Sequence, residues 1–509
     1  MLSAAVGASA GGQVGAFARA GGFRCRCESI RGPPGLERST GVPALSHPGL
    51  VPFLRGAFDL TDARGLSGGG RAAYGGFHGV QVLEGVLKKR VVVTGMGVVS
   101  PLGVGYALMW QRLMEGKSGI RAIDRFPVSQ LASRVAGLVP LGLGPGELDL
   151  EKGFAPRETK RNDPFILYAK KATEEALADA RYAPEDPREK ERVGVILGTG
   201  IGGFSTLAQG AVDFAARGEA GISAYFITAQ LANLASGQIA VAYGFGGPNY
   251  SVMSACATGA EAIASGVRAI LLGEADVVVA GGSDAAVHPL TIAGFAKAHA
   301  LSTHFNDCPQ RASRPFDSAR DGFVMAEGAG VLILESYEHA AARGARIHAE
   351  LAGYASVSDG YHITATHPEG LGEQRALRLA LERAEIPPDA VDYLNAHATG
   401  TQIGDAGELH AIQAVFGKDS RLAISSTKGA MGHTFGAAGA IEAIVSVLSI
   451  MHQACPPTLN LETPDPEFAG LDLVRGKPEE RPIRVALSNS FGFGSTKVAL
   501  AFSQVSDEK

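Results

Sequence analysis

The sequence contains no run of about 18 uninterrupted apolar residues, so its composition does not indicate a membrane-spanning helix. Cysteine is scarce: the five cysteines are scattered, and those beyond residue 88 show neither a metal-site spacing nor a disulfide framework. Positive charge is not in excess, because 46 Lys and Arg are outnumbered by 51 Asp and Glu, which argues against a nucleic-acid scaffold. The remainder, 509 residues with 46% hydrophobic and 19% charged side chains, is typical of a large globular enzyme.

Residues 1–88 differ in composition from the rest of the chain. They are rich in Gly, Ala, Ser and Arg, and no acidic residue precedes Glu28, although Arg19, Arg24 and Arg26 have already occurred. They also lack the compact apolar segment of a secretory signal. We therefore predict an organellar transit peptide; a tail without a targeting role is the alternative, and composition does not separate mitochondrion from plastid.

Beyond residue 88, short apolar segments alternate with segments of helical spacing. The β-branched content and closing glycines of the apolar segments predict buried strands. This alternation indicates an α/β layered fold with largely parallel sheets. The expected strands lie within residues 88–103, 192–203, 275–286 and 328–336, and then within 347–358, 391–401, 422–433 and 485–502.

One strand-to-helix unit surrounds Cys256. Residues 250–259 have the small, apolar side chains of a buried strand, and residues 260–273 carry Val267 and Ile270 at helical spacing. A cysteine at such a turn lies near unpaired backbone N–H groups and the positive end of the helix dipole, which both favour the thiolate. A lone cysteine in apolar surroundings is more often inert, so the remaining motifs decide between the two interpretations.

The chain contains what look like two copies of this unit. Residues 254–273 and 431–451 both pass from a strand through a polar turn residue into a helix of small residues. Gly259 follows Cys256 by three positions, as Gly436 follows His433. If the two halves pack about a pseudo-twofold axis, a thiol and an imidazole enter one pocket.

Three further motifs carry the chemistry that an activated cysteine requires. They are His397 with Thr399 and Thr401, Lys428 with His433, and Phe491 with Phe493 in the glycine-rich loop 488–496. Glycines let a backbone approach a ligand closely, and the phenyl rings between them can move. Singly, these motifs are also compatible with a core histidine, a surface lysine and a hairpin turn; together they favour a catalytic site.

A second glycine motif suggests a different class of protein. Gly198, Gly200 and Gly203 match the G-x-G-x-x-G dinucleotide fingerprint after an expected strand. No clear βαβ repeat with a ribose-binding acid follows. A dehydrogenase is therefore the minor alternative.

From about Lys89 to the C-terminus, the sequence resembles the elongating β-ketoacyl-acyl carrier protein synthases of the thiolase superfamily, most of all the mitochondrial type. The resemblance rests on ordered motifs: RVVVTGMGVVSPLG, SACATG, ADVVVAGG, SRPFDSARDGFVMAEGAGVLILE, NAHATGT, SSTKGAMGHTFGAAGAIEA and SNSFGFGST. It implies a duplicated thiolase fold, five-layered α-β-α-β-α with two mixed, mostly parallel sheets, usually as a homodimer. The halves would be residues 89–340 and 341–509, and the mitochondrion becomes the favoured compartment.

The resemblance also implies a mechanism. Cys256 attacks an acyl thioester delivered on acyl carrier protein, and the backbone N–H groups of Cys256 and Phe493 form the oxyanion hole. Malonyl-acyl carrier protein then loses carbon dioxide, and His397 and His433 stabilise the enolate that attacks the acyl group. The acyl chain grows by two carbons, with no metal and no cofactor besides the phosphopantetheine arm of the carrier protein.

Supporting roles follow from the same resemblance. Lys428, paired with Glu442, gives electrostatic support, Thr399 and Thr401 hydrogen-bond the phosphopantetheine arm, and Phe493 gates the acyl pocket. A basic group falls where the family docks its acidic carrier protein, although such charges are also typical of a solvated face. This group consists of Arg157, Lys160 and Arg161.

Some positions depart from the family pattern. Ser495, Thr496 and Lys497 follow the gating phenylalanine where Gly-Thr-Asn is usual, and serine tolerates fewer backbone angles than glycine. Leu234 replaces a usual methionine in a segment that borders the acyl pocket in relatives, and His299 replaces a usual arginine.

Related classes of the superfamily differ from this chain at the residues that define them. A degradative thiolase needs a second cysteine in the C-terminal glycine loop, an initiating synthase has asparagine where His433 stands, and a chain-length factor lacks Cys256. From another class, a non-catalytic partner of acyl carrier protein would not need the intact set of one cysteine and two histidines.

Overall fold

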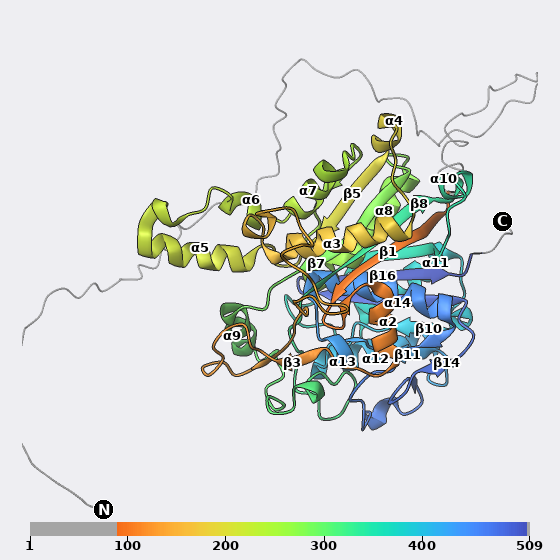
Figure 1. The fold of residues 1–509 in the computed structure, drawn as a ribbon. Coiled ribbons are helices and arrows are strands. Elements are labelled where there is room, and N and C mark those ends of the chain that lie inside the picture. The colour runs from red at the N-terminus through yellow and green to blue at the C-terminus, as the bar shows by residue number, and fades with distance from the viewer. Residues whose placement is uncertain (1–88, 506–509) are drawn as a thin grey trace, which may run out of the picture. The chain divides into compact units, whose positions relative to one another are not determined.

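The structure is a computed structural model, and it describes residues 89–505. The transit peptide expected over residues 1–88 lies outside the described residues. The first strand, β1 (Val91–Ser100), is buried at every position, as its β-branched run predicts. Figure 1 shows helices and strands intermixed along the chain, in agreement with the expected α/β class.

The strands before residue 340 form one half of a large mixed sheet. With β1 they are β2 (Gly103–Val104), β5 (Val193–Gly198), β6 (Asn249–Tyr250), β7 (Val277–Asp284) and β8 (Gly328–Ser336). Their order is β1-β8-β7-β5-β6, with β2 paired to the end of β1. The first two pairings of this order are antiparallel and the next two are parallel.

The later strands repeat this arrangement. They are β9 (Ala349–Ser358), β10 (Tyr393–Asn395), β11 (Ala423–Ser425), β13 (Asp472–Leu473), β15 (Val485–Gly492) and β16 (Thr496–Ser503). Their order is β9-β16-β15-β10-β11-β13. Again the first two pairings are antiparallel, and those that follow are parallel.

The sheet differs in two respects from the two mostly parallel sheets expected. Hydrogen bonds join the strands into one 12-stranded sheet, because β1 pairs with β9 at Val92–Glu350 and Val93–Ala349. Antiparallel pairings also slightly outnumber parallel ones across residues 89–505. Part of the reason is local: only residues 493–495 separate β15 from β16, and so short a connection forces an antiparallel pair.

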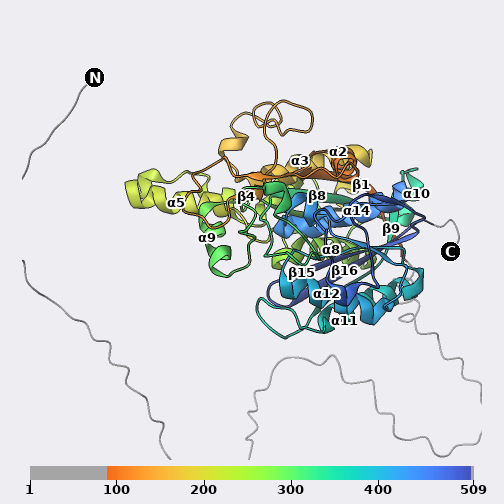
Figure 2. The same cartoon turned by 90° about the horizontal axis from the view of Figure 1, so that it is seen from below.

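Helices cover both outer faces of the sheet halves and fill the space between them. The main ones are α3 (Pro164–Asp179), α7 (Leu234–Tyr243), α8 (Thr258–Leu271), α11 (Leu371–Ala384), α12 (Gln402–Phe416) and α14 (Ala438–His452). Helix α3 packs on β1 and β8, and α11 packs on β9 and β16. Helices α8 and α14 pack on each other and contact strands of both halves. Figure 2 shows α3 and α11 on opposite sides, with α8 and α14 between them.

The remaining elements are shorter or lie at the periphery. Two small antiparallel sheets pair β3 (Ile120–Ala122) with β4 (Val135–Gly137) and β12 (Ala454–Cys455) with β14 (Glu479–Glu480). Figure 1 shows that one helical segment, α5, projects from the body together with α6. The other helices are α2 (Tyr106–Met114), α4 (Pro187–Lys190), α5 (Phe204–Arg217), α6 (Phe226–Gln230), α9 (Pro289–Lys297), α10 (Tyr337–Ala342) and α13 (Lys428–Met431).

The contact between α8 and α14 depends on small residues. A Cβ atom on Gly259 would lie 2.8 Å from the backbone nitrogen of Ala440, and one on Gly439 would lie 2.8 Å from that of Ala260. Real Cβ atoms do not approach backbone so closely, so these glycines let the two helices touch. The two contacts mirror each other, since Gly259 meets Ala440 and Gly439 meets Ala260. Residues 259 and 439 are 180 positions apart, and so are residues 260 and 440.

The same offset relates the turns before these helices. Ala255 and Phe435 both have positive φ, 50° and 51°, at the start of short 3-10 turns. In the structure Cys256 therefore corresponds to Gly436, and the sequence expectation that paired it with His433 was wrong by three residues. The short similarity of the motifs did not fix the register.

The expected buried strand before Cys256 also differs from what forms. Strand β6 has only two residues, Asn249 and Tyr250, and both are exposed because β6 is the last strand at the edge of the sheet. The helix after the cysteine forms as expected, over α8.

One described helical segment, Phe435–His452, is long and apolar enough to cross a membrane by length and composition. However, 89% of that segment is buried inside the protein. Its apolar character is that of a core helix, since α14 packs against strands of both halves of the sheet.

Candidate active site

One cavity of about 850 Å³ collects most of the residues that the sequence singles out. Cys256, His397 and His433 all line it, although they come from segments far apart in the chain. The other predicted residues in its wall are Thr399, Thr401 and Phe493.

Cys256 lies in the 3-10 turn Ala255–Ala257, directly before α8. Burial raises the pKa of its thiol to about 12, and the carboxyl of Asp284 adds to this shift. The charge of Lys428 and the backbone N–H groups of Phe493 and Cys256 lower the pKa of the thiol, but they do not outweigh burial. The expected resting thiolate is therefore not supported, because desolvation exceeds the effect of the turn.

Two backbone N–H groups point at the sulfur of Cys256, its own and that of Phe493. The chain segments that carry them come close because Gly492 has no side chain. A Cβ atom at Gly492 would lie 2.3 Å from the carbonyl oxygen of Ser254 and 3.4 Å from the backbone nitrogen of Cys256. Fixed N–H donors at this position can stabilise negative charge that develops beside the sulfur.

The rings of His397 and His433 lie close together in the cavity wall, edge to face. Their ring centroids lie 5.4 Å apart, with the ring planes at 87°. Burial, followed by the charge of Lys428, lowers the pKa of both His397 and His433 well below the ordinary value, so both rings are neutral near pH 7. Within residues 89–505, Nδ1 of His397 and both ring nitrogens of His433 have no hydrogen-bond partner. They are free to bond a ligand.

Backbone contacts fix where the two imidazoles stand. The N–H of His433 donates to Val324 O at 2.8 Å, and its carbonyl accepts from Ala326 N at 2.8 Å. The carboxylate of Glu408, on α12, accepts the N–H groups of His397 and Ala398 at 2.9 and 2.7 Å. Sequence reasoning missed Glu408, because its burial and its backbone partners are apparent only in the folded chain.

Lys428 and Glu442 form a buried ion pair, as predicted. Burial raises the pKa of Glu442 to about 7 against the opposing effect of Lys428. Neither side chain lines the cavity. Because the charge of Lys428 acts on Cys256, His397 and His433, its influence on the site is electrostatic.

The glycine motif at residues 198–203 lies beside Cys256 but does not form a phosphate cradle. Asp284 accepts the N–H groups of Gly200 and Ile201 at 2.9 and 3.2 Å, and Gly203 N donates to Gln230 O at 3.1 Å. These donors are occupied within the protein, so they cannot cradle a phosphate. Asp284 also accepts Gly436 N, and it is a second residue that sequence reasoning missed.

Thr399 and Thr401 stand together in the cavity wall, with their hydroxyl oxygens 3.2 Å apart. Two buried residues hold the intervening backbone in place. Asp405 accepts Gly400 N at 3.1 Å, and Arg320 donates to the carbonyl of Thr401 at 3.2 Å.

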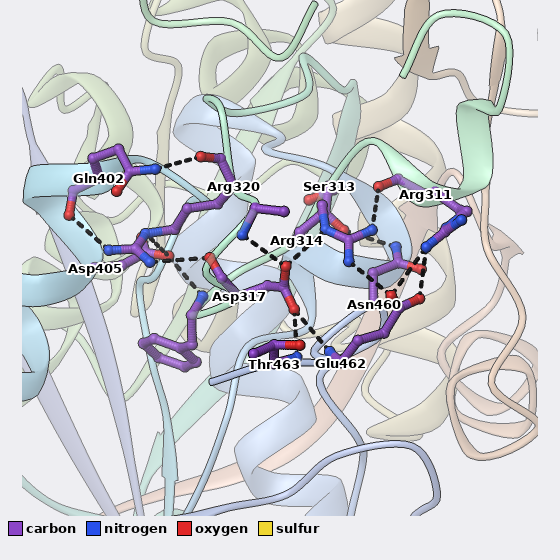
Figure 3. A network of polar contacts seen from close by, with 12 residues as sticks. Arg311, Ser313, Arg314, Asp317, Arg320, Gln402, Asp405, Asn460, Glu462 and Thr463 are labelled. Carbon is purple, nitrogen blue, oxygen red and sulfur yellow. Dashed lines mark hydrogen bonds and ion pairs between the residues drawn. The ribbon is translucent and has the colours of Figure 1, made fainter. Parts of the chain in front are cut away.

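Arg320 and Asp405 belong to a larger polar network, shown in Figure 3. Buried Arg314 pairs with Asp317 at 3.1 Å, and Asp317 accepts the backbone N–H groups of Glu462 and Thr463 at 2.8 Å. The long polar connection between β7 and β8 is therefore part of the scaffold behind the threonines.

The basic group lies elsewhere. Arg157, Lys160 and Arg161 are exposed, and none of them lines the cavity. The guanidinium carbon of Arg161 lies 4.7 Å from the ring centroid of Tyr225, just before α6.

Some of the positions that depart from the family pattern line the cavity and others do not. His299, Ser495 and Lys497 line the cavity, whereas Leu234, at the start of α7, does not. Within residues 89–505, no three His, Cys, Asp or Glu side chains are grouped to hold a metal ion.

Comparison with known proteins gives matches to one family. The chain matches the β-ketoacyl synthase N-terminal domain over residues 88–340 and the C-terminal domain of the same family over residues 348–462. The 3-oxoacyl-acyl-carrier-protein synthase 2 of Rhizobium meliloti is 46% identical over 414 residues, which cover 81% of this chain and 98% of that protein. The mitochondrial 3-oxoacyl-acyl-carrier-protein synthase of Arabidopsis thaliana is 45% identical over 434 residues, 82% of this chain and 94% of that one.

A solved structure gives the same result for the fold. A type II polyketide ketosynthase, in complex with its acyl carrier protein and bound to the hexaketide, superimposes with a TM-score of 0.75 at 34% identity. The match covers 82% of this chain and all of the ketosynthase. The resemblance stated from the motifs, and the elongating synthase activity it implies, are confirmed: the chain belongs to the β-ketoacyl synthase family.

Proposed function

We propose that Cys256, His397 and His433 carry out the decarboxylative condensation of a malonyl thioester with an enzyme-bound acyl chain. The observation that carries this proposal is their convergence on one cavity, with two backbone N–H groups at the sulfur and two neutral imidazoles opposite. Among residues 89–505, no other cysteine lines this cavity.

In the first half-reaction, the sulfur of Cys256 attacks the thioester carbonyl and its proton leaves. A neutral imidazole in the cavity accepts this proton and passes it to the departing phosphopantetheine thiolate. The N–H groups of Cys256 and Phe493 stabilise the oxyanion. A protonated resting thiol suits this step, because the charge then develops only in the transition state.

In the second half-reaction, malonyl-acyl carrier protein loses carbon dioxide and leaves an enolate. The unpartnered ring nitrogens of His397 and His433 donate to its oxygen. The enolate carbon attacks the acyl carbonyl on Cys256, and the thiolate leaves. The product is a 3-oxoacyl thioester two carbons longer.

The substrates arrive on the phosphopantetheine arm of acyl carrier protein, for which Thr399 and Thr401 offer hydroxyl groups in the cavity wall. Exposed Arg157, Lys160 and Arg161 are the proposed docking site for the acidic carrier protein. A related ketosynthase in complex with its own acyl carrier protein supports the carrier protein as a partner.

The fold proposal is a duplicated thiolase unit in five layers, with halves at residues 89–340 and 341–509. It is supported by the repeated pairing directions of the two strand sets and by the reciprocal α8–α14 contact. The packing of α3 on one strand set and α11 on the other, around the central helices, supports the layering.

A homodimer is proposed across the sheet edge at β6, whose side away from β5 has no strand beside it within residues 89–505. Exposed apolar side chains on the nearby segments support it: Leu207, Val212, Phe214, Ile227, Val241 and Tyr250. For localisation we propose the mitochondrion, with the plastid as alternative, because one relative is a mitochondrial enzyme.

Partial reactions test the catalytic roles. The Cys256→Ala variant should form no acyl-enzyme and no 3-oxoacyl product, yet still decarboxylate malonyl-acyl carrier protein. His397→Ala and His433→Ala should retain acylation better than condensation, which should slow about 100-fold. Elongation by the Cys256→Ala protein would falsify the nucleophile assignment, and normal condensation by either histidine variant would remove that residue from enolate stabilisation.

A further inference from the structure

The turn that carries Phe493 is hydrogen-bonded to a second segment, residues 359–366, of which residues 362–366 line the cavity. Gly494 N donates to the carbonyl of Ile363 at 2.8 Å. Asp359 N donates to the carbonyl of Ser495 at 3.2 Å, and the hydroxyl of Ser495 donates to the carbonyl of His362 at 3.2 Å. Because these bonds cross from one segment to the other, the Phe493 turn cannot move away without breaking them.

Lys497 adds charge to the same contact. Its side chain is only 3% exposed, and its Nζ lies 2.9 Å from Oδ2 of Asp359 and 3.8 Å from Oε1 of Glu373. Glu373, on α11, also accepts a hydrogen bond from the hydroxyl of Thr366, at the other end of the segment. The ammonium group thus sits between the two ends of residues 359–366.

The packing around Lys497 leaves room for its long side chain. A Cβ atom on Gly372 would lie 3.2 Å from Cγ of Lys497 and 2.5 Å from Cβ of Asp359. The ammonium lies 5.9 Å from the ring centroid of Phe491, two residues before Phe493. A buried lysine is tolerated only with paired charges, and Asp359 and Glu373 supply them.

Ser495 and Lys497 are the two positions where this chain departs from the Gly-Thr-Asn of the family pattern. Ser495 has φ of 71°, a left-handed conformation that glycine adopts without strain. Its hydroxyl makes a bond to the facing segment that glycine cannot make. Likewise, asparagine carries no charge to pair with Asp359. Both changes therefore strengthen the same contact.

We propose that Ser495 and Lys497 form a latch, which holds the Phe493 turn to residues 359–366 and limits how fast the acyl pocket opens. Lys497 is a positioning residue that acts through the turn, and its charge also adds to the effects that lower the pKa of His397. A long acyl chain needs the pocket open, whereas a short chain needs less displacement. The latch therefore slows entry of long acyl chains and shields the acyl-enzyme from water. This inference rests on the gating and nucleophile roles proposed above.

Single-turnover acylation tests the latch in the full chain. Wild-type protein, Lys497→Met and Ser495→Ala are mixed with butanoyl- or dodecanoyl-acyl carrier protein, and acyl-enzyme is followed by intact mass. Hydrolysis of the acyl-enzyme is then timed without malonyl-acyl carrier protein. Lys497→Arg preserves the charge, and Lys477→Met is a control at an exposed lysine.

The latch predicts that Lys497→Met accelerates dodecanoyl transfer about tenfold, equivalent to ~1.4 kcal/mol, and changes butanoyl transfer little. Hydrolysis of its dodecanoyl-enzyme also accelerates, Ser495→Ala shifts both rates in the same direction, and Lys497→Arg remains near wild type. Asp359→Asn combined with Lys497→Met should add nothing to Lys497→Met alone.

Two results for Lys497→Met would overturn the latch. The first is an unchanged rate of transfer for both the butanoyl and the dodecanoyl chain. The second is an equal loss of rate for both acyl chains together with a lower thermal midpoint, which would mean that the lysine is purely structural. Ser495→Ala decides the matter if Lys497→Met fails to fold. Failure of the proposed function is distinguishable, because the wild-type protein itself would then not be acylated at Cys256.

Discussion

At the scale of single residues, one buried cation that does not line the cavity acts on three residues that do. Lys428 lowers the pKa of Cys256, His397 and His433, and its partner Glu442 is itself buried. The histidines remain neutral because burial, followed by the charge of Lys428, lowers the pKa of both. The cysteine remains protonated because burial exceeds the attraction of one lysine.

The state of the cysteine is directly measurable. Since the pKa of the Cys256 thiol is raised to about 12, its alkylation rate should rise about tenfold per pH unit from pH 7 to 10, without a plateau. Iodoacetamide modification, followed by peptide mass, measures this rate. A plateau at or below pH 8 would restore the resting thiolate expected from the turn alone.

The Lys428–Glu442 pair makes a prediction about stability. Glu442 has its pKa raised to about 7 in the folded protein, above the unfolded value of 4.5, so its contribution to stability is lost as pH rises through 7. Lys428→Met removes the opposing charge and raises the pKa of Glu442 further. The stability lost by the variant relative to wild type should then grow by up to about 1.4 kcal/mol per pH unit above pH 7.

Urea denaturation at several pH values measures this difference, with Lys477→Met as the control at an exposed lysine. A loss that stays the same from pH 6 to pH 9 would show that Glu442 is not the group responsible.

At the scale of elements, glycines at close contacts bring the site together. Gly492 lets the loop after β15 approach the Cys256 turn, and Gly259 and Gly439 let α8 and α14 cross. The site is thus assembled where the two central helices begin. A side chain at any of these positions would push apart elements that each carry a site residue.

Gly492→Ala tests this at the oxyanion donors. Its Cβ would meet the carbonyl of Ser254 at 2.3 Å, which displaces the Phe493 N–H from the sulfur. Losing one such donor should slow condensation by about 100-fold. The control is Gly294→Ala on exposed α9, where no atom lies within 4 Å of the added Cβ. Equal activity of the two variants would argue against the backbone approach.

Sequence patterns predicted most elements at this scale because their burial is visible as periodicity. Strands β1, β7, β8 and β9 and helix α8 lie where the apolar segments predict them. The motifs also placed Cys256, His397 and His433 in one pocket. Register and pairing direction were not predictable, because they depend on contacts between distant segments, as the 180-residue offset and the β1–β9 pairing show.

The residues that sequence reasoning missed were missed for one shared reason. Glu408 and Asp284 act by accepting backbone N–H groups from other elements. An acid used in this way has no spacing signature, since its partners come together only in the folded chain. The raised pKa of Cys256 was also not predictable from the sequence, because burial depends on all the residues that pack around the thiol in the folded chain.

At the scale of the whole molecule, the sheet ends in an edge that the described chain does not cover. Strand β6 is exposed, and Val241 on the preceding helix is 84% exposed. Apolar side chains beside an open strand edge favour a second copy of the chain as the partner.

Val241→Glu should therefore shift the protein from dimer to monomer in light scattering, because a charge at an apolar interface is costly to bury. Leu143→Glu, at a loop residue 76% exposed, is the matched control. A wild-type protein that is monomeric, or a Val241→Glu protein that dimerises like wild type, would rule out this face.

The central claim is that Cys256 holds the acyl chain while the malonyl carbon adds to it. Purified protein is acylated with dodecanoyl-acyl carrier protein, and the modified peptide is located by mass spectrometry. Malonyl-acyl carrier protein is then added. The account predicts that the acyl group is found on Cys256 alone and that it is released as a 3-oxoacyl thioester two carbons longer. An acyl group on another residue, or 3-oxoacyl product formed with no acyl-Cys256 intermediate, would contradict it.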